Sequence, residues 1–267
     1  MNSRNLLLNA YVYLVLCFLV VPILIILPMA FSETDYITFP PRGFTWQWFG
    51  AFFQSAQWMS ATAFSAKIAF FTAISSAIIG LCASYAIVRG KGALATIFQT
   101  LLIGPIVVPH IALAIALYLM FQSVGLTETT AGYVFAHTII ALPFSVFTIV
   151  AALSQIDPAL EDAAMCCGAN RILAFRAVTL PLIWPNVLSG ALFAFVISFD
   201  EPVISFFLAG VRDKTLPRMM FDDIEQNLTP IIPAIAVMLT LLSIIVLAGA
   251  AGLRALATRS QHAVSEE

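Results

Sequence analysis

The chain has 267 residues, of which 61% are hydrophobic and only 10% charged, and its formal net charge is −2 at pH 7. A mean hydropathy of +0.99 lies far outside the range of soluble domains and indicates a protein that crosses a membrane several times. The charge balance and the lack of any Lys/Arg-rich run exclude a nucleic-acid-binding surface. The four cysteines form neither a disulfide framework nor a zinc-ligand spacing.

Six apolar segments predict six transmembrane helices, because each is close to the roughly 20 residues that a helix needs to cross a bilayer. These segments are residues 10–31, 66–88, 97–122, 131–153, 187–209 and 231–253. The first exceeds the apolar core of a secretory signal peptide, which is about 7 to 15 residues long, so we interpret it as a membrane helix. We expect an all-α membrane protein with a single transmembrane domain over residues 1–267.

The distribution of Lys and Arg predicts the orientation, since an even number of helices places both termini on one side. Cytoplasmic termini put seven of the twelve basic residues inside, namely Arg4, Arg89, Lys91, Arg171, Arg176, Arg254 and Arg259. The tight turn that carries Arg89 and Lys91 favours the same choice. Residues 32–65 would then form an outer loop, and residues 154–186 would face the cytoplasm.

The segment 154–186 carries a helix pattern of its own. Asp157 followed by Pro158 predicts an N-cap, and Gly168 is typical of the residue just past a helix end. The helix between them would present a narrow apolar stripe, which suits docking against another surface. This stripe consists of Leu160, Ala163, Ala164 and Cys167.

A second short helix is expected after the first. Asn170 is a good N-cap, and the helix would end near Val178 because Pro181 and Pro185 cannot continue it unbroken.

Ionisable residues inside apolar segments are candidates for function, since a charge at mid-bilayer costs at least about 2.5 to 3.5 kcal/mol. Asp200 and Glu201 lie in the fifth segment, and Pro202 should kink the helix directly after them. Two interpretations remain open for this pair. The carboxylates either face a water-filled path or mark a helix end that lipid headgroups solvate.

His110 and His137 are the other ionisable groups in the apolar segments. A metal site or a proton relay is conceivable, but no second metal-ligand spacing accompanies them, so a hydrogen-bonded neutral histidine is favoured and no metal site is expected. The sequence contains no GxSxG, HExxH or GxxxxGK[ST] motif. The chain is therefore not expected to be an enzyme, and ATP-driven transport would need a separate ATPase chain.

The segment 154–186 resembles the EAA loop of the membrane subunits of binding-protein-dependent ABC importers. That motif reads Glu-Ala-Ala, three residues, Gly, nine residues, then Ile, any residue, Leu and Pro. Its positions fall on Asp162, Ala163, Ala164, Gly168, Val178, Leu180 and Pro181. Asp162 replaces the motif's glutamate, and Glu161 beside it offers a second carboxylate.

The resemblance implies a type I ABC importer permease fold, whose first short cytoplasmic helix is a coupling helix that sits in a groove of the ATPase subunit. The coupling residues that it implies are Leu160, Glu161, Asp162, Ala163, Ala164, Gly168, Ala169, Leu180 and Pro181. It leaves open whether Glu161 or Asp162 makes the ATPase contact.

The resemblance also implies partners and a location. The expected partners are a second homologous permease chain, two ATPase subunits, a periplasmic or lipid-anchored solute-binding protein, and membrane lipid. No cofactor is expected in this chain, because the partner ATPase subunits would bind ATP and Mg. The expected location is the bacterial inner membrane, with both termini in the cytoplasm.

Residues 198–210 and 215–237 are similar to permeases of the spermidine/putrescine type. This similarity implies alternating-access transport of polyamines or related small amine-bearing solutes, although the subfamily also serves opines, aminobutyrate and aminophosphonates. Carboxylates and aromatic faces could replace the hydration of an amine along the path. The expected path residues are Asp200, Glu201, Phe199, Phe206 and His110. The alternative is a stand-alone proton-coupled secondary transporter that uses His110, His137 and Asp200 as a relay.

Overall fold

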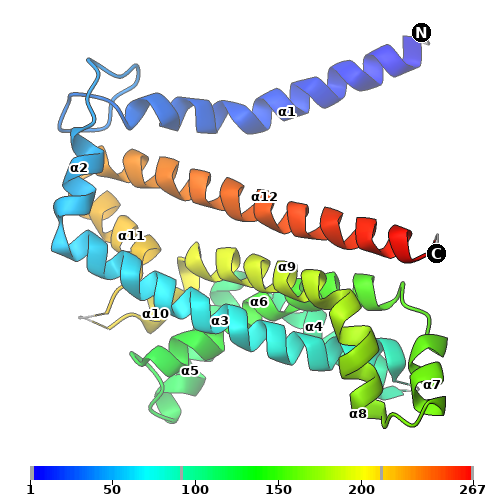
Figure 1. The fold of residues 1–267 in the computed structure, drawn as a ribbon. Helices are drawn as coiled ribbons and strands as arrows, with labels where there is room; N and C mark the ends of the chain where they lie inside the picture. Colours follow the sequence, from blue (N-terminus) through cyan, green and yellow to red (C-terminus); the bar gives the residue numbers. More distant parts are fainter. Residues whose placement is uncertain (1–2, 91–92, 211–212, 266–267) are drawn as a thin grey trace. The chain divides into compact units, whose positions relative to one another are not determined.

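The computed structural model describes residues 3–90, 93–210 and 213–265, with side chains over 8–90, 96–210 and 213–252. Within this part of the chain every regular element is helical (Figure 1), which confirms the prediction of an all-α protein. Several basic residues that carried the predicted orientation lie outside the described residues or have no described side chain: Arg4, Lys91, Arg254 and Arg259.

Among the described residues, five helical stretches are long and apolar enough to cross a membrane. They lie within α1 (Ser3–Met29), α3 (Ala56–Arg89), α6 (Thr130–Leu153), the run that ends with α9 (Leu180–Phe199), and α12 (Ile231–Ser265). The remaining helices are α2 (Gln47–Gln54), α4 (Ala93–Val107), α5 (His110–Ser123), α7 (Ala159–Cys166), α8 (Arg171–Ala174), α10 (Val203–Leu208) and α11 (Leu216–Gln226).

The predicted transmembrane helix over 97–122 is broken into two helices. α4 and α5 meet at a bend of 107°, so the count is six spans only if this bent pair forms one of them. Pro109 directly precedes α5 and donates no backbone N–H, which explains why the helix breaks there.

The predicted continuous helix over 187–209 is also wrong. α9 ends at Phe199, and the separate short helix α10 begins at Val203, directly after Pro202. Pro202 therefore lies at a complete interruption of the helix rather than at a kink.

The predicted end of the second short helix near Val178 is a third error. α8 continues through a π-helical turn, η1 (Phe175–Thr179), directly into α9. Pro181 lies in the first turn of α9, directly after the π turn, and the run stays helical there although Pro181 donates no backbone N–H. The wider π turn joins the two helices without a stop.

The outer connection is shorter than predicted, since α3 begins at Ala56 rather than near residue 66. Its irregular part is held by hydrogen bonds: the Thr45 N–H donates to the Phe31 carbonyl at 2.8 Å, and the Trp48 indole N–H donates to the Ser32 carbonyl at 2.8 Å. The rings of Phe31, Phe44, Trp46 and Phe49 pack together over this connection.

The chain separates into two compact units, residues 1–60 with 219–242 and residues 61–218 with 243–267. The single transmembrane domain over 1–267 stays a prediction. Both candidate sites lie in the second unit.

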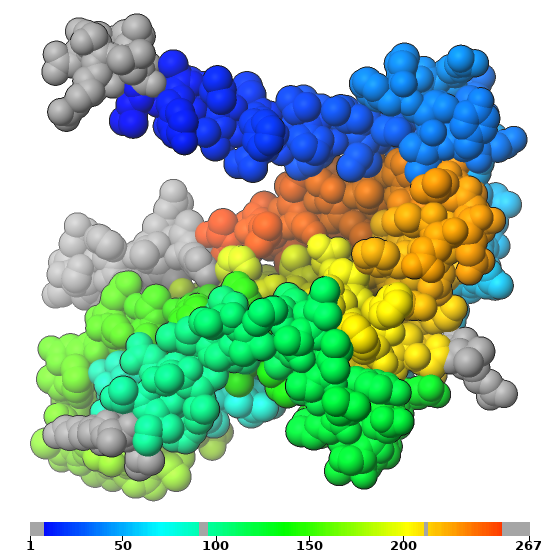
Figure 2. All heavy atoms as spheres, turned by 180° about the vertical axis from the view of Figure 1, so that it is seen from behind, coloured from blue at the N-terminus to red at the C-terminus, as the bar shows by residue number. Residues whose placement is uncertain are grey.

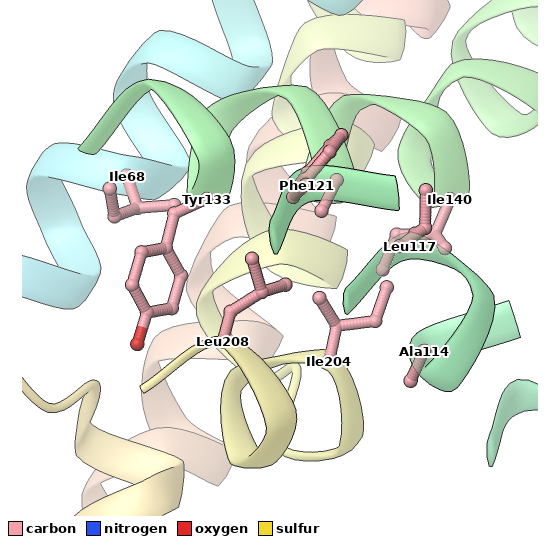
Figure 3. Packing of buried hydrophobic residues seen from close by; sticks show 9 residues of the cluster. Ile68, Ala114, Leu117, Phe121, Tyr133, Ile140, Ile204 and Leu208 are labelled. Carbon is pink, nitrogen blue, oxygen red and sulfur yellow. The ribbon is translucent and has the colours of Figure 1, made fainter. Parts of the chain in front are cut away.

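In the second unit, α6 packs along α9, and small residues bring the helices close. The Ser145 hydroxyl of α6 lies where a Cβ on Gly80 of α3 or on Gly190 of α9 would meet it at 2.9 Å. A cluster of buried apolar side chains joins α3, α5, α6 and α10 (Figure 3). In that cluster Ile204 and Leu208 of α10 point toward Leu117 and Phe121 of α5.

α4 and α5 lie on the surface of the second unit (Figure 2), and many of their apolar side chains are exposed. Examples are Leu101, Val107, Ile111 and Leu119. Such a surface suits lipid or another membrane chain.

Candidate functional site

α7 is capped at both ends by its own sequence. The Asp157 side chain accepts the Ala159 N–H at 2.9 Å, which confirms the predicted capping role. At the other end Gly168 adopts a φ of +96°, and the Gly168 N–H donates to the Met165 carbonyl at 2.9 Å. The Ala169 N–H donates to the Ala164 carbonyl at 3.1 Å, which completes a Schellman turn. The predicted end at Gly168 is therefore confirmed.

Most of the α7 surface has no covering element within the described chain. Leu160, Ala163 and Cys167 of the apolar stripe are exposed and Ala164 is partly buried, and Asp162, which lies off the stripe, is exposed as well. The small side chains would allow another surface to approach the helix backbone closely. Of the two acidic residues, Asp162 is the one that such a surface can reach.

Glu161 is the buried acid of α7, with 6% of its surface exposed. Its carboxylate accepts the Thr179 hydroxyl at 2.6 Å and the Tyr85 hydroxyl at 2.9 Å, and Arg89 Nε lies 3.6 Å from the same group. The expectation that Glu161 could offer a second reachable carboxylate is therefore wrong, because the carboxylate is committed to partners within the chain. Sequence reasoning missed Tyr85, Arg89 and Thr179.

The last two predicted coupling residues lie away from α7. Leu180 and Pro181 form the beginning of α9, where Leu180 is partly buried and Pro181 is exposed. They come directly after Thr179, the last residue of η1. They are therefore not part of the exposed surface of α7.

The interruption between α9 and α10 separates the roles of the two acids predicted there. Glu201 is 6% exposed and accepts the N–H groups of Val203 and Ile204 at 2.8 and 2.9 Å, so it caps α10. His110 Nε2, on a half-exposed ring at the start of α5, lies 3.6 Å from the other Glu201 oxygen. Asp200 is exposed. The structure therefore brings His110 and Glu201 together and leaves the Asp200 carboxylate open to a ligand.

The two predicted aromatic residues also differ. Phe199 is buried and stacks on Phe195 with ring centroids 5.7 Å apart. Phe206 is 46% exposed, and the Arg218 guanidinium carbon lies 3.9 Å from its ring centroid. The Phe206 face thus holds a cation, which shows that it can serve in cation–π contact. Arg218 was not predicted, because nothing in the sequence pairs it with an aromatic residue on another helix.

His137 is fully buried at the junction of three helices. Its Nδ1 lies 3.1 Å from the Ser198 carbonyl and 2.8 Å from the Ser198 hydroxyl, and its Nε2 lies 3.4 Å from the Ser205 hydroxyl. A carbonyl can only accept, so its contact favours a proton on Nδ1, with Nε2 then accepting from the Ser205 hydroxyl. This geometry fits the favoured interpretation of a hydrogen-bonded histidine. In the part of the chain that the structure describes, no three His, Cys, Asp or Glu residues are grouped to hold a metal ion.

The family model for the inner membrane component of binding-protein-dependent transport systems matches residues 76–259, which is more than half of the chain. The spermidine/putrescine transport system permease protein PotC of Haemophilus influenzae is 31% identical over 91% of this chain and 94% of its own length. The putrescine transport system permease protein PotI of Escherichia coli K12 is 29% identical over 83% of this chain and 81% of its own length.

The fold has solved counterparts. A chain from a crystal structure of a bacterial ABC transporter involved in alginate import matches with a TM-score of 0.68 and 17% identity, over 92% of this chain and 96% of that chain. The match confirms the expected importer permease fold. These findings support the binding-protein-dependent importer and give no support to the stand-alone proton-coupled transporter. The chain belongs to the family of inner-membrane components of binding-protein-dependent transport systems.

Proposed function

We propose that this chain forms the translocation path for polyamines, or related small amine-bearing solutes, in an ATP-driven importer that works by alternating access. The relatives named for spermidine and putrescine transport support this substrate class. The observation that carries the coupling role is α7 itself, a helix capped at both ends that exposes a stripe of small residues with the complete EAA spacing.

The exposed face of α7 docks into a groove of the ATPase subunit. Ala163 permits close approach, Asp162 supplies the carboxylate for a basic group in the groove, and Leu160 adds apolar area. Two ATPase subunits bind ATP and Mg, and a second homologous permease chain completes the membrane part. α7 and both chain termini face the cytoplasm.

The path itself uses the interruption between α9 and α10. Asp200 offers an exposed carboxylate there, and Phe206 on the next helix offers an aromatic face that Arg218 now occupies. An ammonium group that leaves water and displaces the Arg218 guanidinium can exchange its hydration for these two contacts. Glu201 and His110 shape this region by fixing the start of α10 beside α5.

Co-purification tests the docking of α7. In the complete complex, we expect Asp162→Lys combined with Ala163→Leu to release the ATPase subunits, because the variant reverses the charge and fills the space for close approach. The control is Asp35→Lys, the same charge reversal on an exposed residue of the connection after α1. Retention of the ATPase by the α7 variant, to the same extent as the control, would contradict the docking.

The substrate class is tested on the solute-binding protein that delivers to this permease. Calorimetric titration with putrescine, spermidine, 4-aminobutyrate and 2-aminoethylphosphonate should show the tightest binding for one of the two polyamines. Binding of only the aminobutyrate or the aminophosphonate would overturn the polyamine assignment and keep the importer.

A further inference from the structure

Glu161 lies at the centre of a group of buried and partly buried polar side chains, which we call the Glu161 cluster and which also contains Tyr85, Arg89 and Thr179. The three partners come from two other elements, since Tyr85 and Arg89 belong to α3 and Thr179 ends η1. Both carboxylate oxygens are used, one by Tyr85 and the other by Thr179 and Arg89. One side chain of α7 therefore holds α3 and η1 at once.

Further contacts around the Glu161 cluster join the end of α3 to η1 and to the residues just before α7. Arg89 also donates from Nη2 to the Ile156 carbonyl at 3.0 Å, which fixes the chain just before α7 to the end of α3. The Tyr85 ring packs edge-on against Phe175 of η1, with ring centroids 5.0 Å apart. Tyr85 and Val88 further pack against a buried apolar cluster that includes Ile156 and Ile183. Hydrogen bonds to a buried carboxylate resist rearrangement because breaking one leaves a charge without a partner.

Within α7, the residues that can contact an ATPase subunit differ from the residue that contacts the rest of this chain. Asp162 and Ala163 point away from the protein, whereas Glu161 is the one buried residue of α7. A displacement of the exposed face must move the Glu161 carboxylate, and with it the end of α3 and the last residue of η1. The π turn is a suitable place to absorb such a displacement, since π turns are short local departures from α-helical geometry and are frequent at functional sites.

We infer that Glu161 is the positioning residue through which movement of α7 reaches α3 and η1, and that Glu161 makes no contact with the ATPase. This inference rests on the proposed docking of α7 to an ATPase subunit. It assigns different roles to adjacent acids, with Asp162 binding the partner and Glu161 transmitting its motion.

The test uses the complete transporter in proteoliposomes, with putrescine as the transported probe. Two quantities are measured: the ATPase retained per permease, and the putrescine taken up per ATP hydrolysed. We expect Glu161→Gln to retain the ATPase as the unmodified complex does, while uptake per ATP falls at least about fivefold, the lower end of measured coupling effects. A merely structural role would lower recovery, hydrolysis and uptake together and leave their ratio unchanged.

Asp162→Asn is the matched control, because it makes the same chemical change on the exposed neighbour. It should reduce ATPase retention and leave uptake per ATP of the remaining complexes near the unmodified value. Tyr85→Phe removes one donor to Glu161 and nothing else, so it should lower uptake per ATP in the same direction. Its effect should not add to that of Glu161→Gln in the double variant, since both act on one network.

Three results would overturn the inference: release of the ATPase by Glu161→Gln as strong as that by Asp162→Asn, an unchanged uptake per ATP, or additive effects in the double variant. If Glu161→Gln is not recovered from membranes, the inference is tested with Tyr85→Phe alone, by the putrescine taken up per ATP hydrolysed. Failure of the proposed function looks different, because the unmodified chain would then retain no ATPase and show no ATP-dependent uptake.

Discussion

Two pairs of adjacent acidic residues each contain one buried and one exposed carboxylate. At the start of α7, Glu161 is buried and Asp162 is exposed, and after α9, Asp200 is exposed and Glu201 is buried. In each pair the buried acid fixes helices within the chain, while the exposed acid remains available to an outside group. Under the proposed function, Asp162 therefore contacts the ATPase and Asp200 contacts the solute.

Substitution of Glu201 should lower the stability of the protein, whereas substitution of Asp200 should lower transport. Glu201→Ala removes the acceptor for two backbone N–H groups of α10, so we expect a loss of about 1.5–3 kcal/mol in the free energy of unfolding. Asp200→Ala should leave the thermal unfolding midpoint in detergent unchanged and lower putrescine uptake by the complete transporter. Normal uptake with Asp200→Ala would remove Asp200 from the path.

The close approach of α6 and α9 gives a second prediction at this scale. Gly190→Ala places a Cβ 2.9 Å from the Ser145 hydroxyl and 3.2 Å from Ser145 backbone atoms, and backbone atoms cannot easily move aside. We expect a destabilisation of about 1–3 kcal/mol, read as a lower unfolding midpoint. Gly249→Ala is the control, because nothing lies within 4 Å of that Cβ. Equal midpoints for the two variants would contradict the packing.

The sequence predicts the acidic pairs but not which member of each is buried. Neighbouring helix positions differ by about 100° in direction, so burial depends on partners elsewhere in the chain. For Glu161 these partners lie 76 and 18 residues away, at Tyr85 and Thr179. No local pattern marks such a pairing, and the same holds for Arg218 on Phe206.

At the level of elements, the ends of α7 could be predicted because their signals are local. The Asp157 side chain and the positive φ of Gly168 act within two or three residues of the helix ends. The effect of prolines could not be predicted in the same way. Pro109 and Pro202 stand at breaks, whereas Pro181 and Pro185 lie within a continuous helical run. The difference arises from packing and from the π turn, which single-residue propensities do not contain.

The turn after α7 predicts a coupling defect. Gly168→Val places a β-branched residue at a φ of +96°, which strains the Schellman turn by about 1–3 kcal/mol. We expect lower solute-stimulated ATPase activity with normal membrane insertion. Gly168→Asn should keep more activity, since asparagine tolerates this region better. Full stimulation by the valine variant would show that coupling does not need this turn.

The hydrogen bonds of His137 join α6 to α9 and α10, so substitution of His137 should lower the free energy of unfolding. His137→Phe fills most of the volume but leaves the Ser198 and Ser205 hydroxyls without their ring partner, at a cost of about 1–3 kcal/mol. The expected result is a lower unfolding midpoint. Ser205→Ala should have a smaller effect, because its contact with the ring is longer, at 3.4 Å. The reverse order would contradict the assigned network.

At the level of the whole molecule, hydropathy alone predicts a polytopic membrane protein, and the family match confirms the transport class. Hydropathy cannot show that one apolar run is bent into α4 and α5, since both halves are apolar. Under the proposed function, lipid and the second permease chain cover the exposed apolar side chains of those helices. The solute path and the energy source would then depend on chains outside this one.

The most direct measurement of the central claim is putrescine uptake into proteoliposomes that contain either the complete transporter or this chain alone. We expect uptake only when the ATPase subunits, the second permease chain, the solute-binding protein and internal ATP are all present, and no uptake under a proton gradient alone. Uptake by the isolated chain, driven by a proton gradient without ATP, would contradict the account.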